Sequence, residues 1–285
     1  MATVTNKYKL PARITRMLPV LKRPDPSRMS TTHLINAPRI RTLLIERFDD
    51  IEYDVSDMLS TLIGISVHEY SESKATTEEE AEHKLTQTVD LNGNPFGITL
   101  VGKADNFFDG HIIDTKTKAV GFEKFGVDKE EEQLNIYAWF QRMEGKEVVD
   151  LVADVLYRDW KLRNTIKKDY PIISYKAMPL KLWSFEKQNQ FILDQLEYHS
   201  SSPYSCSSED RWEKPTTYAV KKTGKQRAER VLDTMEEAEK WMRENNRGDH
   251  IETRKGGCIR CESYCPVRSC CKFSPCCISK WRTEK

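Results

Sequence analysis

The stretch at residues 97–117 reads GITLVGKADNFFDGHIIDTKT, and it indicates what kind of fold the chain adopts. Apolar residues dominate both halves, and Asp109-Gly110 between them is a dipeptide typical of a two-residue β-turn. We therefore predict a strand over 97–107 and a second over 111–117, joined as a hairpin.

The segments on either side of this hairpin alternate between helical and strand patterns. Apolar residues at helical spacing, with Ser56 as a cap, predict a helix over 57–74, and a strand over 86–91 precedes the turn residues Asn92-Gly93-Asn94. After the hairpin, the pattern predicts a helix over 123–143 and an apolar strand over 148–157. This order is typical of an α/β core with a mixed central sheet flanked by helices.

The remaining segments predict an arm and a separate C-terminal part. Residues 1–28 contain four prolines and seven Lys or Arg against the single acid Asp25, which indicates an extended basic arm. Past a predicted helix over 185–198, strands over 216–222 and 226–232 flank Gly224 as a basic hairpin. Thr234-Met-Glu-Glu237 matches a capping box and predicts a helix to about residue 245.

Net charge gives no information about a polyanionic partner, because 45 Lys and Arg balance 44 Asp and Glu. The two basic stretches, 1–28 and 214–230, are equally consistent with phosphate contacts and with ordinary solvated surface. No stretch approaches the roughly 18 apolar residues of a membrane span, and the N-terminus lacks a signal-peptide pattern. We therefore expect no membrane association and a cytoplasmic location, in the host cytoplasm if the protein is encoded by a phage.

The hairpin also carries the candidate catalytic groups. Alternation along a strand sends Asp114 and Lys116 to one face, and Asp105, from the neighbouring strand, can approach that face. Two carboxylates form a hard oxygen site of the kind that Mg²⁺ or Mn²⁺ prefers, with an ammonium group beside it. This set suits phosphodiester hydrolysis. Taken alone, Asp-Thr-Lys is more often an exposed charged hairpin.

Three further motifs shift that balance. The chain contains Gly64-Ile-Ser-Val-His68, Gly102-Lys-Ala-Asp105, Asp114-Thr-Lys116 and Gln133-Leu-Asn-Ile-Tyr137, in this order. In this series it resembles the RecB-like branch of the PD-(D/E)XK nuclease superfamily, which implies a restriction-endonuclease-like core. The resemblance implies that active-site metal ions are bound by His68, Asp105, Asp114 and the backbone carbonyl of Thr115. It also implies that Lys116 is catalytic and that Gln133 and Tyr137 support the site and contact DNA.

The cysteines form a second group, since seven of the eight lie between Cys258 and Cys277. Disulfides are rare in reducing compartments, so this grouping indicates metal ligation. Several RecB-like nucleases, including CRISPR-associated exonucleases and phage homologues, hold a [4Fe–4S] cluster on one distant and three C-terminal cysteines. Resemblance to the phage subgroup implies ligation by Cys206, Cys261, Cys265 and Cys271. Cys258 is the main rival ligand, and structural Zn²⁺ is the alternative metal.

Together these inferences predict an arm over 1–29, a nuclease core over 30–200 and a Cys-rich iron–sulfur lobe with a basic hairpin over 201–285. The expected activity is that of a Mg²⁺- or Mn²⁺-dependent deoxyribonuclease. We expect an exonuclease that acts on single-stranded or end-bearing DNA in phage recombination, replication or repair. The alternatives are a structure-selective endonuclease and a non-catalytic DNA-binding module with an architectural metal centre. Whether the protein forms an oligomer or has a recombination partner stays open.

Overall fold

A computed structural model describes residues 2–74, 98–201 and 205–271 of the 285-residue chain. The chain divides into two compact units between residues 203 and 204, and each unit is described by itself. Within the described residues, no helix combines the length and the apolar character needed to cross a membrane.

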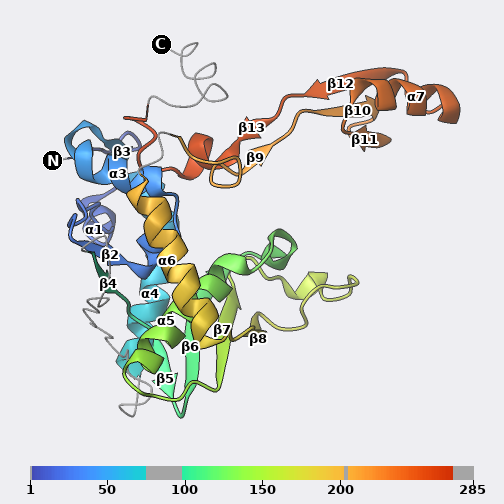
Figure 1. The fold of residues 1–285 in the computed structure, drawn as a ribbon. Helices are drawn as coiled ribbons and strands as arrows, with labels where there is room; N and C mark the ends of the chain where they lie inside the picture. Colours follow the sequence, from blue (N-terminus) through green and yellow to red (C-terminus); the bar gives the residue numbers. More distant parts are fainter. Residues whose placement is uncertain (1, 75–97, 202–204, 272–285) are drawn as a thin grey trace. The chain divides into compact units, whose positions relative to one another are not determined.

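The first unit is built around a four-stranded sheet of order β5-β6-β7-β8 (Figure 1). Strand β6 pairs with β7 in parallel, whereas β5 with β6 and β7 with β8 are antiparallel. The predicted α/β class with a mixed sheet is therefore confirmed. The strands are β5 (Asn106–Phe108), β6 (His111–Lys118), β7 (Asp150–Tyr157) and β8 (Tyr175–Leu180).

The predicted hairpin is present between β5 and β6. Asp109 and Gly110 both have positive φ angles, 45° and 80°, as a tight turn of this type requires. The prediction of one continuous strand over 97–107 is wrong, because the chain leaves the ladder between β4 (Thr99–Val101) and β5. Asp105 ends this break, and its carboxylate accepts a hydrogen bond from the Thr115 backbone N–H.

Gly102, at the start of the break, allows close packing against the core. A Cβ atom here would lie 2.6 and 2.9 Å from two ring carbons of Phe140, which is fully buried. Gly102→Ala is therefore expected to lower the free energy of unfolding by about 1–3 kcal/mol, measured by thermal denaturation. Gly64→Ala is the control. Its Cβ would meet Thr117 Oγ1 at an ordinary 3.6 Å, so stability should stay level or rise by up to about 1 kcal/mol.

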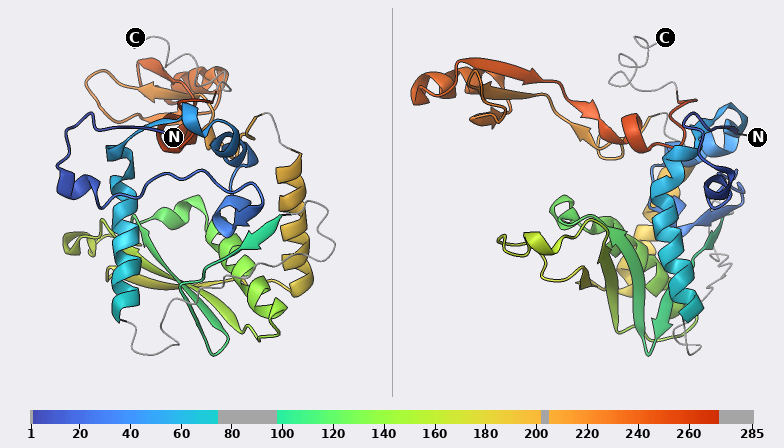
Figure 2. Two further views of the ribbon diagram at one scale, coloured as in Figure 1. Left: turned by 90° about the vertical axis from the view of Figure 1, so that its left-hand side faces the viewer. Right: turned by 180° about the vertical axis from the view of Figure 1, so that it is seen from behind.

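Helices cover both faces of the sheet, with α4 (Leu59–Lys74) on one side and α5 (Asp128–Met143) and α6 (Phe185–Ser200) on the other (Figure 2). Helix α5 packs its apolar residues against the inner faces of β6 and β7, and together they form the hydrophobic core. The helix predicted over 123–143 begins later than expected. A 3₁₀ turn, η3 (Phe122–Phe125), ends at Gly126 with φ of 86°, which an uninterrupted helix cannot contain.

The N-terminal segment predicted as an arm contributes strands to small sheets. Strand β1 (Thr3–Thr5) pairs with β3 (Glu52–Asp54), and β2 (Arg28–Ser30) pairs with β4. The strand predicted over 86–91 and its turn at 92–94 lie outside the described residues. The remaining elements of this unit are α1 (Ala12–Thr15), α2 (Thr31–Leu34), α3 (Pro38–Glu46) and the 3₁₀ turns η1 (Phe48–Asp50), η2 (Val55–Met58) and η4 (Leu162–Asn164).

The second unit contains a three-stranded sheet of order β11-β10-β12 and a short pair, β13-β9. The predicted hairpin is present as β10 and β11, although β11 is shorter than expected. Helix α7 begins where its capping box predicts, since the Thr234 side chain accepts a hydrogen bond from the Glu237 N–H. The elements are β9 (Glu213–Lys214), β10 (Thr217–Lys221), β11 (Arg230–Leu232), α7 (Met235–Asn245), β12 (His250–Arg254), β13 (Gly257–Cys258) and the π-helix η5 (Arg260–Tyr264).

Candidate active site

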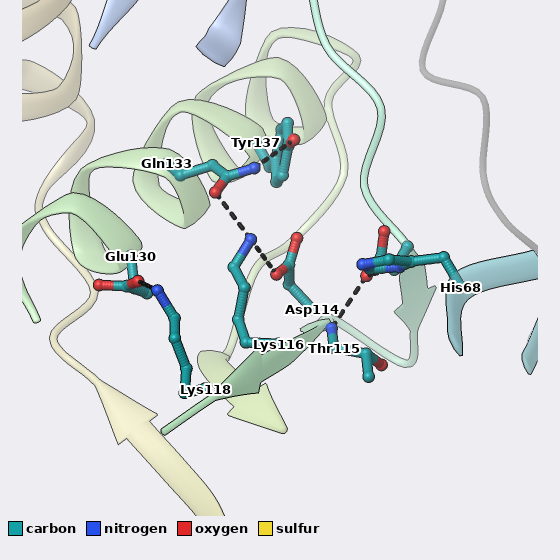
Figure 3. A network of polar contacts seen from close by, with 9 residues as sticks. His68, Asp114, Thr115, Lys116, Lys118, Glu130, Gln133 and Tyr137 are labelled. Atoms are coloured by element: carbon teal, nitrogen blue, oxygen red, sulfur yellow. Dashed lines mark hydrogen bonds and ion pairs between the residues drawn. The ribbon is translucent and has the colours of Figure 1, made fainter. Parts of the chain in front are cut away.

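Strand β6 and helix α5 bring four of the predicted site residues to one place (Figure 3). Asp114 and Lys116 leave the same face of β6 and point toward α5, which carries Gln133 and Tyr137 one turn apart. Asp114 is only 2% exposed, because α5 and the apolar residues of β7 cover this face. The site is therefore built on elements that form the hydrophobic core.

A chain of polar contacts fixes the position of Lys116. Its Nζ lies 2.6 Å from Asp114 Oδ2 and donates a hydrogen bond of 2.9 Å to Gln133 Oε1. Gln133 Nε2 in turn donates to the Tyr137 hydroxyl at 2.9 Å. Gln133 and Tyr137 therefore hold the ammonium group beside the carboxylate.

Asp105 links His68 to the backbone of β6. Asp105 Oδ2 accepts a hydrogen bond from Thr115 N at 2.9 Å and lies 3.0 Å from His68 Nδ1. His68 comes from α4, so Asp105 connects this helix to the backbone of β6. The Thr115 side chain faces α4 and lines a cavity of about 920 Å³ between that helix and the sheet.

The electrostatics of the site favour a bound cation. Burial raises the pKa of Asp114, and the nearby Asp105 charge raises it further, while Lys116 opposes both effects. Burial also raises the pKa of the Tyr137 hydroxyl, with a smaller contribution from Asp114. A divalent cation held by Asp105 and Asp114 would offset the repulsion between the two carboxylates and the cost of burying Asp114. In donor chemistry the residues present suit Mg²⁺ or Mn²⁺, and among the described residues His68, Asp105 and Asp114 do not form a preassembled metal site.

His68 provides a test of this environment. Its hydrogen bond to Asp105 raises its pKa above the ordinary 6.5, against the opposing effect of partial burial. In metal-free protein, His68 should therefore stay protonated to a higher pH than a free histidine. This protonation stabilises the fold below the ordinary pKa, and the stabilisation is lost as pH rises through the raised pKa. NMR titration in EDTA should show the raised value, and Asp105→Asn should bring it back down. A His68 that titrates at or below 6.5 in wild-type protein would contradict the contact.

The structure places one charged pair here that the sequence did not predict. Lys118, the last residue of β6, forms an ion pair with Glu130 in the first turn of α5 (Figure 3). The available signal was spacing: Lys118 lies two residues after Lys116, and Glu130 lies three before Gln133. Those intervals return to the same faces of a strand and of a helix.

The four cysteines predicted to bind a cluster all belong to the second unit. Cys206, Cys261, Cys265 and Cys271 are partly buried. Burial raises the pKa of the Cys206 thiol to about 11, with contributions from Asp210, Cys265 and Cys271, and burial likewise raises that of Cys265.

These interactions put Cys206 within electrostatic range of two C-terminal thiols. Cys258, the rival ligand, is fully buried. Over residues 2–74, 98–201 and 205–271, no three His, Cys, Asp or Glu side chains form a preassembled metal site.

Comparison with known proteins identifies the family. The family model of the PD-(D/E)XK nuclease superfamily matches residues 32–272. The chain belongs to the PD-(D/E)XK nuclease superfamily. A solved structure, that of SSO0001, is similar at a TM-score of 0.44 and 16% identity, covering 66% of this chain and 81% of that one. No curated protein matches the chain significantly. Nucleases of this superfamily typically use Mg²⁺ or Mn²⁺, and their substrate is DNA.

Proposed function

We propose that this protein is a RecB-like, Mg²⁺- or Mn²⁺-dependent DNA nuclease whose active site consists of His68, Asp105, Asp114, Thr115, Lys116, Gln133 and Tyr137. The observation that carries the proposal is the placement of Lys116, held 2.6 Å from a buried carboxylate by Gln133. In a member of this nuclease superfamily, a lysine held in this way is better explained as a catalytic group than as part of an exposed charged hairpin.

The metal ligands in this proposal are His68, Asp105, Asp114 and the Thr115 carbonyl. Bound Mg²⁺ or Mn²⁺ supplies a water of lowered pKa and neutralises charge that develops on the phosphate. Lys116 positions that water or stabilises the developing negative charge, since its ammonium is already oriented before the substrate binds. Gln133 and Tyr137 act through Lys116, because their hydrogen bonds lead to it.

Within this class we propose an exonuclease that acts on single-stranded or frayed DNA ends in phage recombination, replication or repair. A structure-selective endonuclease is the alternative on the same catalytic groups. A non-catalytic DNA-binding module would not need the intact set of Asp105, Asp114 and Lys116.

The test is digestion of end-labelled linear DNA, single- and double-stranded, beside covalently closed circles of the same sequence. With Mg²⁺ or Mn²⁺, an exonuclease should degrade the linear molecules and leave the circles intact, and EDTA should stop the reaction. Cleaved circles would indicate the endonuclease. Binding without cleavage under either metal would indicate the non-catalytic module.

We further propose that Cys206, Cys261, Cys265 and Cys271 bind a [4Fe–4S] cluster in the second unit. Four thiolates are the usual ligands of such a cluster, and they also suit structural Zn²⁺. Cys265 and Cys271 both contribute to the raised pKa of the Cys206 thiol, which supports the long-range part of this set. Such a cluster would link residues that are distant along the chain.

A further inference from the structure

The ion pair of Lys118 with Glu130 continues the contacts of the candidate active site along the same strand. Lys116 meets Gln133, and two residues later Lys118 meets Glu130, one turn earlier on α5 (Figure 3). The side chains of Lys116 and Lys118 therefore extend from the same face of β6, and the Cα atoms of the two residues are roughly 6.6 Å apart. That interval is comparable to one nucleotide of an extended sugar–phosphate backbone.

We propose that Lys118, oriented by Glu130, binds the phosphate next to the scissile one and so forms a second phosphate subsite. This inference rests on the proposed nuclease function. It gives Lys118 a contact with the substrate but no part in the chemical step.

In this pair the Lys118 ammonium group is accessible to solvent, whereas the Glu130 carboxylate is largely buried. The Lys118 side chain is 31% exposed, whereas that of Glu130 is 10% exposed. An ammonium group has three N–H donors, and Glu130 uses one of them, so donors remain for phosphate oxygens. Lys118 Nζ also lies 5.5 Å from the centre of the Phe122 ring, which limits the directions it can take.

Glu130 is placed to orient Lys118. It lies in the first turn of α5, where the positive end of the helix dipole stabilises a carboxylate. A buried carboxylate also requires a partner cation, which keeps the Lys118 side chain on this face of the strand. With less conformational freedom to lose, Lys118 binds a phosphate at a smaller entropic cost.

The same helix offers a matched control. Lys129 pairs with Glu132 at 2.9 Å, and the Lys129 side chain is 61% exposed. Both residues of this pair lie within α5. The pair therefore resembles the Lys118 pair in chemistry and differs in its position relative to β6.

The experiment measures KM, kcat and the salt dependence of single-stranded DNA binding for Lys118→Gln, Lys118→Gln/Glu130→Gln and Lys129→Gln. Lys118→Gln alone leaves the buried Glu130 carboxylate without its partner cation, which destabilises the fold. The double variant removes both charges and so avoids this effect. Both Lys118 variants should raise KM about tenfold with kcat little changed, because a phosphate contact acts in ground and transition states alike. The slope of log binding constant against log salt should fall by about 0.7. Lys129→Gln should behave as wild type.

Binding is measured in Ca²⁺ by anisotropy of labelled DNA, independently of cleavage. Wild-type protein that cleaves DNA, with KM and salt slope unaffected by either Lys118 variant, would overturn the subsite. A fall in kcat alone would also overturn it, because Lys118 would then act in the chemistry. Protein that binds DNA through Lys118 without cleaving it would keep the subsite and overturn the nuclease function. Protein that neither binds nor cleaves would overturn both.

Discussion

Asp114→Asn is expected to reduce DNA cleavage by at least about 10³-fold while the melting temperature stays level or rises. The loss follows because Asn cannot supply the negative charge that a divalent cation needs beside Asp105. The stability follows from the pKa of Asp114, which burial raises. A raised carboxyl pKa means that the charged form costs folding free energy near neutral pH, and Asn removes that charge without changing the shape.

Lys116→Gln should lose activity to a similar extent and should also lower the melting temperature. Asp114 then remains buried without the ammonium group that lies 2.6 Å away in the wild type. The opposite stability changes of the two variants separate a catalytic defect from misfolding.

The measurements are turnover of end-labelled DNA, thermal denaturation, and DNA binding in Ca²⁺, which both variants should retain. Asp109→Asn is the matched control, because Asn also tolerates the positive φ of this exposed turn position. Wild-type turnover in Asp114→Asn would remove the catalytic assignment, whatever the stability result.

The sequence predicted the central hairpin and its flanking helices because their signals are local. Asp109-Gly110 specifies its turn, and Thr234 specifies the start of α7, through contacts within a few residues. The candidate site was equally accessible, since alternation along β6 fixes which side chains share a face with Asp114. These features do not depend on where the rest of the chain lies.

The errors arise where tertiary contacts decide the local structure. The break between β4 and β5 depends on Phe140, 38 residues after Gly102, and on the Asp105 contact with the Thr115 backbone. Strand β8 was not predicted, because Pro179 interrupts its pattern. Proline is tolerated there because β8 lies at the edge of the sheet, where one side of the strand needs no ladder partner.

The pair of Lys118 with Glu130 shows the same limit within the site. Each residue alone is typical of a solvated surface, and neither belongs to the motifs that identify the family. Only the packing of α5 against β6 brings them together. Pairwise contacts between elements therefore carry information about the site that spacing within each element does not.

The second large effect concerns the cysteines. Anaerobically purified protein is expected to be brown, with broad absorbance in the blue and roughly four irons per chain. Alanine substitution of any one of Cys206, Cys261, Cys265 or Cys271 should bleach the protein and make it poorly soluble. Cys276→Ala and Cys277→Ala are the controls and should leave the colour and the solubility unchanged.

The physical reason is the length of chain that the cluster would close. Cys261 follows Cys206 by 55 residues, and β10, β11, α7 and β12 all lie between them. Holding the ends of such a loop together costs conformational entropy, and thiolate–metal bonds are strong enough to offset that cost. Colourless protein with about one Zn²⁺ per chain would keep the link and overturn the iron–sulfur identity. If Cys258→Ala bleached the protein and Cys206→Ala did not, the ligands would be local and the closure of this long loop would play no part in stability.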